Sequence, residues 1–495
     1  MPTSMRQGFD NEKYIELQAA NIRKRIAQFG GKLYLEFGGK LFDDYHASRV
    51  LPGFEPDTKF RMLESLVDDV EIVIAINANH IEKGKTRGDL GIPYDEDVLR
   101  LIDVFRSRGF LVGSVVLTQY ANQPAADAYR LEQLGVTCRL HYPIAGYPHD
   151  IERIVSDDGY GRNEYIETSR PLVVVTAPGP GSGKLATCLS QLYHEHQRGI
   201  DAGYAKYETF PIWNLPLNHP VNIAYEAATV DLDDANIIDP FHLEAYGETT
   251  VNYNRDVEAF PVLKAMMERI MGESPYQSPT DMGVNMAGYA IVDDDACRDA
   301  ARLEIVRRYF AAAVHLKRTG TGEEQVERLR SIMNRAGVTP DLSPARAVAL
   351  EKEAATGAPA GAMVLPDGHV VTGKTGDLLG AASALLMHAL KAVTGVDETI
   401  PVIDDAAIEP ICRLKTEHLN SVNRRLHSDE TLIALSITSA TSPVAARVID
   451  GLKQLRGCDA FFSVIISSTD EALYRKLGIN VCCEPKYERV SLYHR

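Results

Sequence analysis

Runs of apolar residues that alternate with amphipathic segments predict an α/β fold for the first 165 residues. Residues 70–78, VEIVIAINA, are almost wholly apolar, as expected for a strand buried on both faces of a sheet. Residues 95–109 instead place their apolar side chains on one helical face and end at a glycine. Further strands are expected at 32–37, 110–118 and 136–144, and this alternation predicts a parallel sheet.

The clearest strand–turn–helix unit lies at residues 170–199. Apolar residues 172–176 predict a buried strand, which runs into the glycine-rich turn APGPGSGK. After the turn, apolar residues recur at helical spacing from Leu185 to Tyr193, and Gly199 ends the pattern. The sequence therefore predicts a helix that begins at a glycine-rich turn.

The rest of the chain predicts a helical section and then a second α/β region. The pattern is mainly helical from 221 to 336, and a PDG turn within 362–373 predicts a hairpin. Strands separated by helices are expected after it, at 431–438, 458–467 and 479–483. We predict Rossmann-like or P-loop-like parallel sheet layers, a helical middle section and a C-terminal α/β domain, with limits at 1–220, 221–336 and 337–495.

Composition narrows the class of protein. The 495 residues are 45% hydrophobic and 24% charged, as in soluble globular proteins, and carry a formal net charge of −16. That charge argues against a generic nucleic-acid or anionic-membrane binder. The sequence contains no run of 18 apolar residues and no apolar secretory segment at its start. We expect a cytoplasmic homo-oligomer that binds neither nucleic acid nor membranes.

The seven cysteines fit the same compartment. Their number is odd and no zinc-type CxxC pair occurs, which indicates reduced thiols. The adjacent Cys482 and Cys483 end an apolar stretch that is expected to be a buried strand, so we interpret them as packing residues.

The turn at 177–184 has the chemistry of a phosphate site. A turn that enters a helix presents unpaired amide groups and the positive end of the helix dipole, and glycines let the backbone approach an anion. A lysine at the helix start adds a positive charge. The residues predicted to bind a nucleotide or phosphorylated metabolite are Gly179, Gly181, Ser182, Gly183, Lys184 and Leu185.

Two positions depart from the standard phosphate-binding loop, GxxxxGK followed by Ser or Thr. Pro178 replaces the first glycine, and Leu185 replaces the hydroxyl residue that normally binds Mg²⁺. A metal would therefore have to be held in another way. The alternative is an ordinary strand-to-helix turn with a solvated lysine.

Lys206 is the first candidate catalytic residue. The segment AGYAKYETFP, residues 202–211, looks like the strand of dethiobiotin-synthetase and CTP-synthase type enzymes that ends in a phosphate-facing lysine. That local resemblance implies that Lys206 faces a transferred phosphoryl group or its acceptor. In the alternative reading, Glu208 lies on the same face of the strand and pairs with Lys206.

Asp239 and His242 are the other catalytic candidates. Asp239 follows a short apolar pair and could hold Mg²⁺ directly or through water, and His242 could act as a general base. An aspartate before a proline is also a common helix cap.

Two further stretches contain polar or glycine-rich residues that could form a site. The polar loop from Asn77 follows a buried strand, and its residues either line a pocket at the strand end or form a flexible surface loop. Residues 371–377, VTGKTGD, resemble half a phosphate loop but are expected to start a capped helix with Asp377 in its first turn.

Several specific stretches resemble one protein family over essentially the whole chain. They include KLYLEFGGKLFDDYHASRVLPGF, PGPGSGKLATCLSQLYHE and KYETFPIWNLPLNHPVNIAYEAAT. They are similar to the uncharacterised bacterial protein family 0371, built on the domain of unknown function 1846. The resemblance implies a soluble, multidomain bacterial protein and assigns no catalytic residue.

Two functions are consistent with these observations. The first is an ATP-dependent kinase or ligase acting on a small carboxylate, with ATP or another nucleotide on the 178–185 loop, Lys206 at the reacting group and Mg²⁺ near Asp239. The second is a protein that binds a phosphorylated ligand without turnover and has a regulatory role. The missing Mg²⁺ hydroxyl favours the second.

Overall fold

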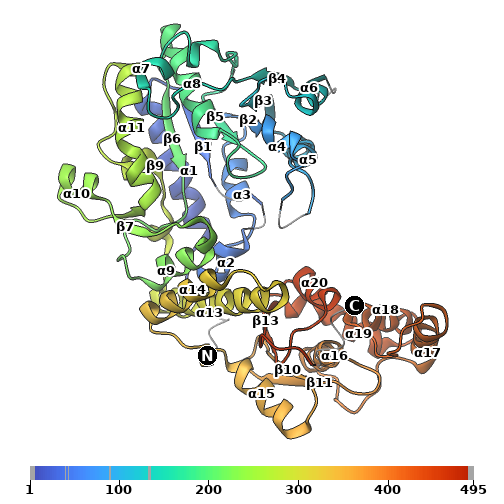
Figure 1. Cartoon of the computed structure of the whole chain (residues 1–495). Coiled ribbons are helices and arrows are strands. Elements are labelled where there is room, and N and C mark those ends of the chain that lie inside the picture. The colour runs from blue at the N-terminus through green and yellow to red at the C-terminus, as the bar shows by residue number, and fades with distance from the viewer. Residues whose placement is uncertain (1–5, 39–40, 43, 88–90, 132–134, 489–495) are drawn as a thin grey trace. The chain divides into compact units, whose positions relative to one another are not determined.

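The computed structural model describes residues 6–38, 41–42, 44–87, 91–131 and 135–488 (Figure 1). They form two compact units. The sheet unit comprises residues 9–225 and 234–292, and the C-terminal unit comprises residues up to Gly8, residues 226–233 and the chain from Asp293 onward. We predicted domain limits at 220 and 336. A division into compact units does not show which segments are independent domains, so these limits stay a prediction.

A seven-stranded parallel sheet organises the sheet unit, as the alternating pattern predicts. Its strand order is β4-β3-β2-β5-β1-β6-β9. The central strands β2 and β5 are lined by fully buried aliphatic residues, which explains their unbroken apolar sequence. The strands are β1 (Leu33–Phe37), β2 (Val70–Asn77), β3 (Leu111–Thr118), β4 (Thr137–Leu140), β5 (Leu172–Thr176), β6 (Gly203–Tyr207) and β9 (Gly283–Val284).

Helices cover both faces of this sheet. On one face, Tyr34 of β1 donates a hydrogen bond to Glu195 of α8, at 2.6 Å, and α11 packs against α8. On the other face, the hydroxyls of Tyr14 in α1 and Tyr207 in β6 lie 2.8 Å apart, and α3 packs against α1. The helices of residues 9–292 are α1 (Asn11–Gln28), α2 (Tyr45–Val50), α3 (Thr58–Glu64), α4 (Ala78–Glu82), α5 (Tyr94–Ser107), α6 (Pro124–Leu131), α7 (Ile151–Ile154), α8 (Lys184–Gln197), α9 (Pro220–Ala228), α10 (Pro240–Tyr246), α11 (Asn254–Met271) and α12 (Pro279–Met282).

The section predicted to be helical also contributes strands. Antiparallel strands β7 (Asn236–Ile238) and β8 (Val251–Tyr253) flank α10, and β9 extends the parallel sheet beyond β6. These strands are only two or three residues long, so they produce no periodicity in the sequence.

The C-terminal unit has its own mixed sheet, ordered β11-β10-β12-β13. The predicted hairpin is confirmed as β10 (Ala360–Val364) and β11 (Val370–Lys374), and β12 (Asp459–Phe462) pairs with β13 (Asn480–Cys483). The helices are α13 (Asp294–Thr319), α14 (Glu323–Ala336), α15 (Pro344–Thr356), α16 (Ala381–Val393), α17 (Asp405–Arg413), α18 (Ser428–Ser439), α19 (Pro443–Asp450) and α20 (Ser468–Lys476).

The strand predicted at 431–438 is wrong, because these residues form most of α18. The buried residues Thr431, Ala434, Leu435 and Thr438 recur at helical spacing. The isoleucines that suggested a strand, Ile433 and Ile437, lie on the exposed face. Among the helices of the described residues, none is long and apolar enough to cross a bilayer.

Candidate functional site

The glycine-rich turn lies at the ends of the neighbouring strands β2 and β5, at a point where the chain continues from one strand to one side of the sheet and from the other strand to the opposite side. From β2 the chain passes to β3 on one side of the sheet, whereas from β5 it crosses β1 to reach β6 on the other side. In open parallel sheets, ligands bind at the carboxyl ends of such diverging strands. Residues 177–183 follow β5 directly, so the turn lies at this switch point.

The turn is closed by its own residues. Gly181 and Gly183 have φ angles of +75° and +86°, in the left-handed region that favours glycine. The buried hydroxyl of Ser182 donates a hydrogen bond to the carbonyl of Gly179, at 2.8 Å. The hydroxyl of Ser182 therefore stabilises the turn, and its predicted role in binding a ligand stays a prediction.

Side chains from β3 and from helices α4 and α5 pack against the three glycines. A Cβ atom added at Gly179 would lie 2.2 Å from the hydroxyl oxygen of Tyr94, and one at Gly183 would lie 2.9 Å from Thr118. At Gly181 the nearest group is the His80 ring, at 3.4 Å. On their Cα side the three glycines give room to the protein's own side chains, and their predicted role in letting an anion approach stays a prediction.

Two neighbouring strand ends hold the turn by its carbonyl groups. The side-chain amide of Asn77 donates to the carbonyl of Gly181, at 3.1 Å, and the hydroxyl of Thr118 donates to the carbonyl of Ser182, at 2.8 Å. In a trans peptide, the C=O and the following N–H point in opposite directions. The N–H groups of Ser182 and Gly183 therefore point away from Asn77 and Thr118.

The amide side of the turn is partly accessible: Gly181 is exposed and residues 183–186 are partly exposed, whereas Ser182 is fully buried. Across the described part of the chain, no acceptor receives a hydrogen bond from the N–H groups of residues 181–186. The last three of these amides belong to the first turn of α8, which has no internal acceptors for them. Pro180 and Gly181 are exposed to solvent. The turn thus presents a row of unpaired donors at the positive end of a 14-residue helix.

Lys184 and Leu185 differ in their surroundings. Lys184 is half-buried and forms no ion pair within the described residues. Leu185 packs against the core of the sheet unit, so apolar packing fills the position where a metal-binding hydroxyl normally lies. Burial, together with the charges of Lys85 and Lys83, lowers the pKa of His80, which favours a neutral imidazole beside the turn.

Lys206 lies on β6 and is neutralised by acidic side chains. Its ammonium group pairs with Glu208, at 2.8 Å, and with Asp256 of α11. Burial alone would lower the pKa of Lys206, but the charges of Asp256 and Glu208 raise it above its usual value. The contact with Glu208 is the alternative that the sequence left open. Its predicted role at a reacting phosphoryl group stays a prediction.

Asp239 and His242 belong to a separate hydrogen-bonded group. One oxygen of the fully buried Asp239 accepts from the backbone N–H groups of Phe241 and His242, at 3.0 and 3.1 Å. Its other oxygen accepts from the hydroxyl and the N–H of Thr280, at 2.7 and 3.2 Å. Asp239 therefore caps α10, as the alternative reading proposed.

His242 is tied to α12. Its Nδ1 lies 2.9 Å from the hydroxyl of Ser278 and 3.6 Å from Asp281. Within the described ranges, no group of three or more His, Cys, Asp or Glu side chains is arranged to hold a metal ion. The metal role of Asp239 and the base role of His242 stay predictions, while the geometry gives both residues structural contacts.

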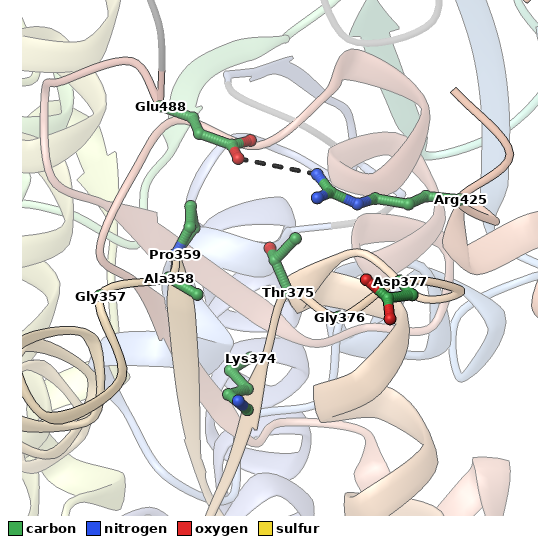
Figure 2. A pocket seen from close by; sticks show the side chains of 9 residues that line it. All are labelled: Gly357, Ala358, Pro359, Lys374, Thr375, Gly376, Asp377, Arg425 and Glu488. Carbon is green, nitrogen blue, oxygen red and sulfur yellow. Dashed lines mark ion pairs between the residues drawn. The ribbon is translucent and has the colours of Figure 1, made fainter. Parts of the chain in front are cut away.

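The C-terminal unit contains a polar pocket of about 360 Å³ (Figure 2). Arg425 and Glu488 lie 3.6 Å apart at this pocket. The half phosphate loop 371–377 contributes to it, but the predicted helix start is wrong: α16 begins at Ala381, and Asp377 lies in the preceding loop. The lining residues are Gly357, Ala358, Pro359, Lys374, Thr375, Gly376, Asp377, Arg425 and Glu488.

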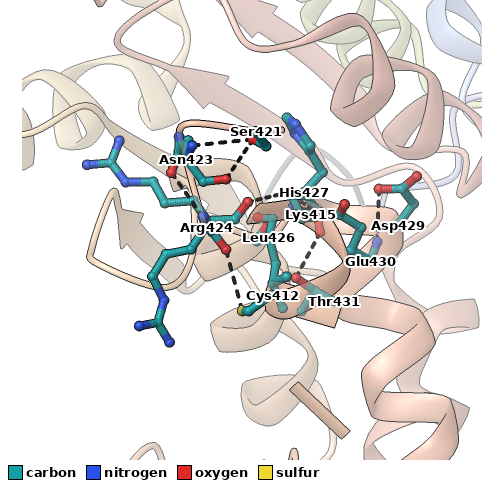
Figure 3. A network of polar contacts seen from close by, with 12 residues as sticks. Cys412, Lys415, Ser421, Asn423, Arg424, Leu426, His427, Asp429, Glu430 and Thr431 are labelled. Carbon is teal, nitrogen blue, oxygen red and sulfur yellow. Dashed lines mark hydrogen bonds and ion pairs between the residues drawn. The ribbon is translucent and has the colours of Figure 1, made fainter. Parts of the chain in front are cut away.

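The segment that carries Arg425 is anchored by buried donors (Figure 3). The ammonium of Lys415 donates to the carbonyl of Arg425 and to Glu430, and Cys412 contacts the carbonyl of Arg424. Because the charges in the pocket are two cationic and two acidic groups, it has no excess of positive charge for a phosphate. We therefore place the candidate phosphate site on the glycine-rich turn.

Sequence reasoning found the turn but missed most of its surroundings. Asn77 was expected near a pocket, and the structure places it against the turn. Thr118, Tyr94 and His80 were not singled out, since they lie 65, 85 and 101 residues before the glycines that they contact. The one available signal was that Thr118 ends an apolar strand, where ligand-facing residues of parallel sheets occur.

The fold and the turn together define an α/β protein with a parallel sheet and a helix that begins at a variant phosphate-loop turn. Family comparison gives a closer assignment. The domain of unknown function DUF1846 matches in two parts, its N-terminal part over residues 7–337 and its C-terminal part over 341–493, and the chain belongs to this family.

Relatives are similar in sequence to this chain over nearly their full length. The UPF0371 protein of Corynebacterium diphtheriae is 59% identical over 495 residues, which covers 99% of each chain. The UPF0371 protein of Streptococcus pneumoniae serotype 19F is 55% identical over 492 residues, covering 99% of this chain and 100% of the relative. The predicted family resemblance is confirmed.

Proposed function

We propose that the sheet unit binds a small phosphorylated metabolite, such as a nucleotide or a sugar phosphate, on the turn at residues 178–185. The phosphate accepts hydrogen bonds from the unpaired amides of the accessible residues 181 and 183–186, and Lys184 supplies a positive charge. One observation carries the proposal: the carbonyl groups and the N–H groups of the turn point to opposite sides. Asn77 and Thr118 bind the carbonyl groups, and the N–H groups have no acceptor among the described residues.

Binding without turnover is the better supported form of this function. Lys206 is already paired with two carboxylates, and Asp239 uses both of its oxygens in hydrogen bonds. A kinase or ligase would need these groups at a reacting phosphate. All seven cysteines are free thiols, which supports a reducing compartment, and a cytoplasmic location is part of the proposal.

Thermal unfolding of the full chain tests the proposal. ATP, GTP, glucose 6-phosphate and inorganic phosphate are added, each with and without Mg²⁺. We expect at least one compound to raise the midpoint without metal, since a ligand at 100 times its Kd stabilises a protein by about 2.7 kcal/mol. Lys184→Ala should remove the response. The matched control is Lys24→Ala, at an exposed lysine of α1.

The outcomes separate the alternatives. Stabilisation that survives Lys184→Ala, or no stabilisation by any of the four compounds, would overturn the proposed site. Stabilisation by a nucleotide only in the presence of Mg²⁺, accompanied by release of inorganic phosphate, would favour an enzyme over a binding protein.

A further inference from the structure

The face of the sheet beneath α8 carries a second polar group close to the proposed phosphate site. Glu36 of β1 pairs in register with Val175 of β5 on one side and with Lys206 of β6 on the other. Paired residues of neighbouring strands point to the same face. Neighbouring strands lie about 5 Å apart, so β5 and β6 are separated by about 10 Å. A small phosphorylated metabolite spans that distance.

This group has more acidic than basic charge. We call Glu36, Lys206, Glu208 and Asp256 the acidic cluster. One ammonium group faces three carboxyl groups: Lys206 pairs with Glu208 and Asp256, and the hydroxyl of Tyr204 donates to Glu36 at 2.8 Å. A ligand reaches part of the cluster, because the side chains of Lys206 and Asp256 are 23% and 26% exposed.

One member of the acidic cluster has an unused oxygen. Glu208 is only 7% exposed, and its carboxyl oxygen Oε2 is buried. This oxygen has no hydrogen-bond partner among the described residues. A buried polar atom of this kind normally pairs with protein, water or a ligand. The oxygen lies beside Gly283, where an added Cβ would meet both Glu208, at 2.9 Å, and the ring of Trp213, at 2.4 Å.

We infer that the ligand of the proposed site presents hydroxyl or amino groups to the acidic cluster, and that it is a phosphorylated polyol or sugar rather than a phosphorylated carboxylic acid. Carboxylate oxygens accept hydrogen bonds from hydroxyl and amino groups. A carboxylate on the ligand would instead meet an excess of negative charge, because the single ammonium group of Lys206 is already paired with Glu208 and Asp256. This inference rests on the proposed function and replaces the expected small carboxylate substrate.

Two phosphate esters that differ at one group provide the test. Glycerol 3-phosphate ends in CH₂OH where 3-phosphoglycerate ends in a carboxylate, and the two molecules are otherwise alike. Isothermal titration of the full chain with each ester gives the ratio of the two Kd values. We expect the glycerol ester to bind at least about tenfold more tightly, as one extra repulsion in a partly buried site implies.

Variants of the acidic cluster locate the cause of the preference. Glu36→Gln and Asp256→Asn each remove one negative charge at nearly constant shape, and we expect both to reduce the ratio. Glu258→Gln, at an exposed position of the same helix α11, should leave the ratio unchanged. The wild-type ratio needs no variant, so the test does not depend on how well the variants fold.

The failure of this inference differs from failure of the proposed function. Equal Kd values, or tighter binding of 3-phosphoglycerate, would overturn the ligand class while leaving a phosphate site in place. If neither ester binds and none of ATP, GTP, glucose 6-phosphate and inorganic phosphate stabilises the chain, the phosphate site itself is refuted, and the inference with it.

Discussion

Gly183 and Gly199 lie at the two ends of α8. Comparing them distinguishes a glycine required by backbone conformation alone from one that is also required by close packing. Both have positive φ angles, +86° and +70°, but only Gly183 has a neighbour, since a Cβ there would lie 2.9 Å from Thr118. We expect Gly199→Ala to cost about 1 kcal/mol, from the backbone conformation alone. Gly183→Ala should cost about 2–4 kcal/mol, because the steric clash is added.

Urea unfolding followed by tryptophan fluorescence measures both changes, because Trp213 is the single tryptophan of the chain and belongs to the sheet unit. Equal losses for the two variants would mean that Thr118 moves aside easily and does not hold the turn.

At the scale of single residues, the sequence identified the turn but not the purpose of its glycines. Glycine spacing is visible in the sequence, and the left-handed conformations of Gly181 and Gly183 agree with it. The packing of Tyr94 and Thr118 against the same glycines depends on which strands become neighbours. Periodicity within one segment carries no such information.

At the scale of elements, Asp239 and Asp10 are helix caps with different numbers of hydrogen bonds. Asp10 is a surface cap of α1 with one bond, to the N–H of Lys13, whereas Asp239 is fully buried and accepts four. We expect Asp10→Ala to cost about 1 kcal/mol, and Asp239→Ala about 3 kcal/mol, since it leaves buried donors unpaired. Trp213 fluorescence in urea measures both. A loss at Asp239 no larger than that at Asp10 would contradict the capping role.

Helices α18 and α20 are linked by the pair His427–Asp470, whose contribution to stability depends on pH. The hydrogen bond to Asp470, at 3.1 Å, raises the pKa of His427 above its ordinary value, with opposing effects from burial and Lys415 and support from Glu430. Burial alone would raise the pKa of Asp470, but its hydrogen bonds with His427, Ser467 and Ser428 lower it.

The sign of the pH effect follows from these directions. The contribution of His427 is complete below about pH 6.5 and is lost as the pH rises through its higher folded pKa. That of Asp470 is complete above about pH 4 and is lost in more acidic solution. We expect His427→Gln to accelerate hydrogen exchange in α18 at pH 6, and to matter less at pH 8.5. A difference from wild type that is the same at both pH values would exclude the ionised pair.

Element prediction succeeded where one face of the chain is buried in a regular way. The strand β5 and helix α8 are read directly from their apolar spacing. The prediction failed at α18, because an apolar run with β-branched residues fits either a strand or a helix when its exposed face is also apolar. The position of β5 between β2 and β1 was not predictable, since strand order depends on contacts far apart in sequence.

At the scale of the whole molecule, residues 6–8 belong to the C-terminal unit. The carbonyl of Gly8 accepts a hydrogen bond from the N–H of Asp293, at 3.2 Å, and its Cα faces Cys297, where an added Cβ would lie 2.7 Å from the sulfur. Burial raises the pKa of the Cys297 thiol to about 12, so this thiol should react slowly with labelling reagents.

We therefore expect Gly8→Ala to loosen this contact, cost about 1–3 kcal/mol and speed the labelling of Cys297. Gly376→Ala is the control, since that glycine has open space around it in the same unit. Mass spectrometry after reaction with a thiol reagent gives the rate. Unchanged labelling in Gly8→Ala would show that the first residues are not part of the C-terminal unit's packing.

Fold class was predictable for the molecule as a whole, because alternating strands and helices indicate a layered α/β fold even when the order of the strands in the sheet is unknown. Unit membership was not, because it depends on short segments such as 226–233, whose helical pattern continues from the sheet unit and does not show which unit they join. The expected homo-oligomer stays a prediction.

The discontinuous C-terminal unit has a consequence for synthesis on the ribosome. Its first residues emerge before any of the sheet unit, yet their partners at Asp293 and Cys297 follow only after the whole sheet unit has been translated. The sheet unit can thus fold while the chain is still growing, whereas the amino-terminal segment has to wait, unpacked, for about 290 residues of further translation.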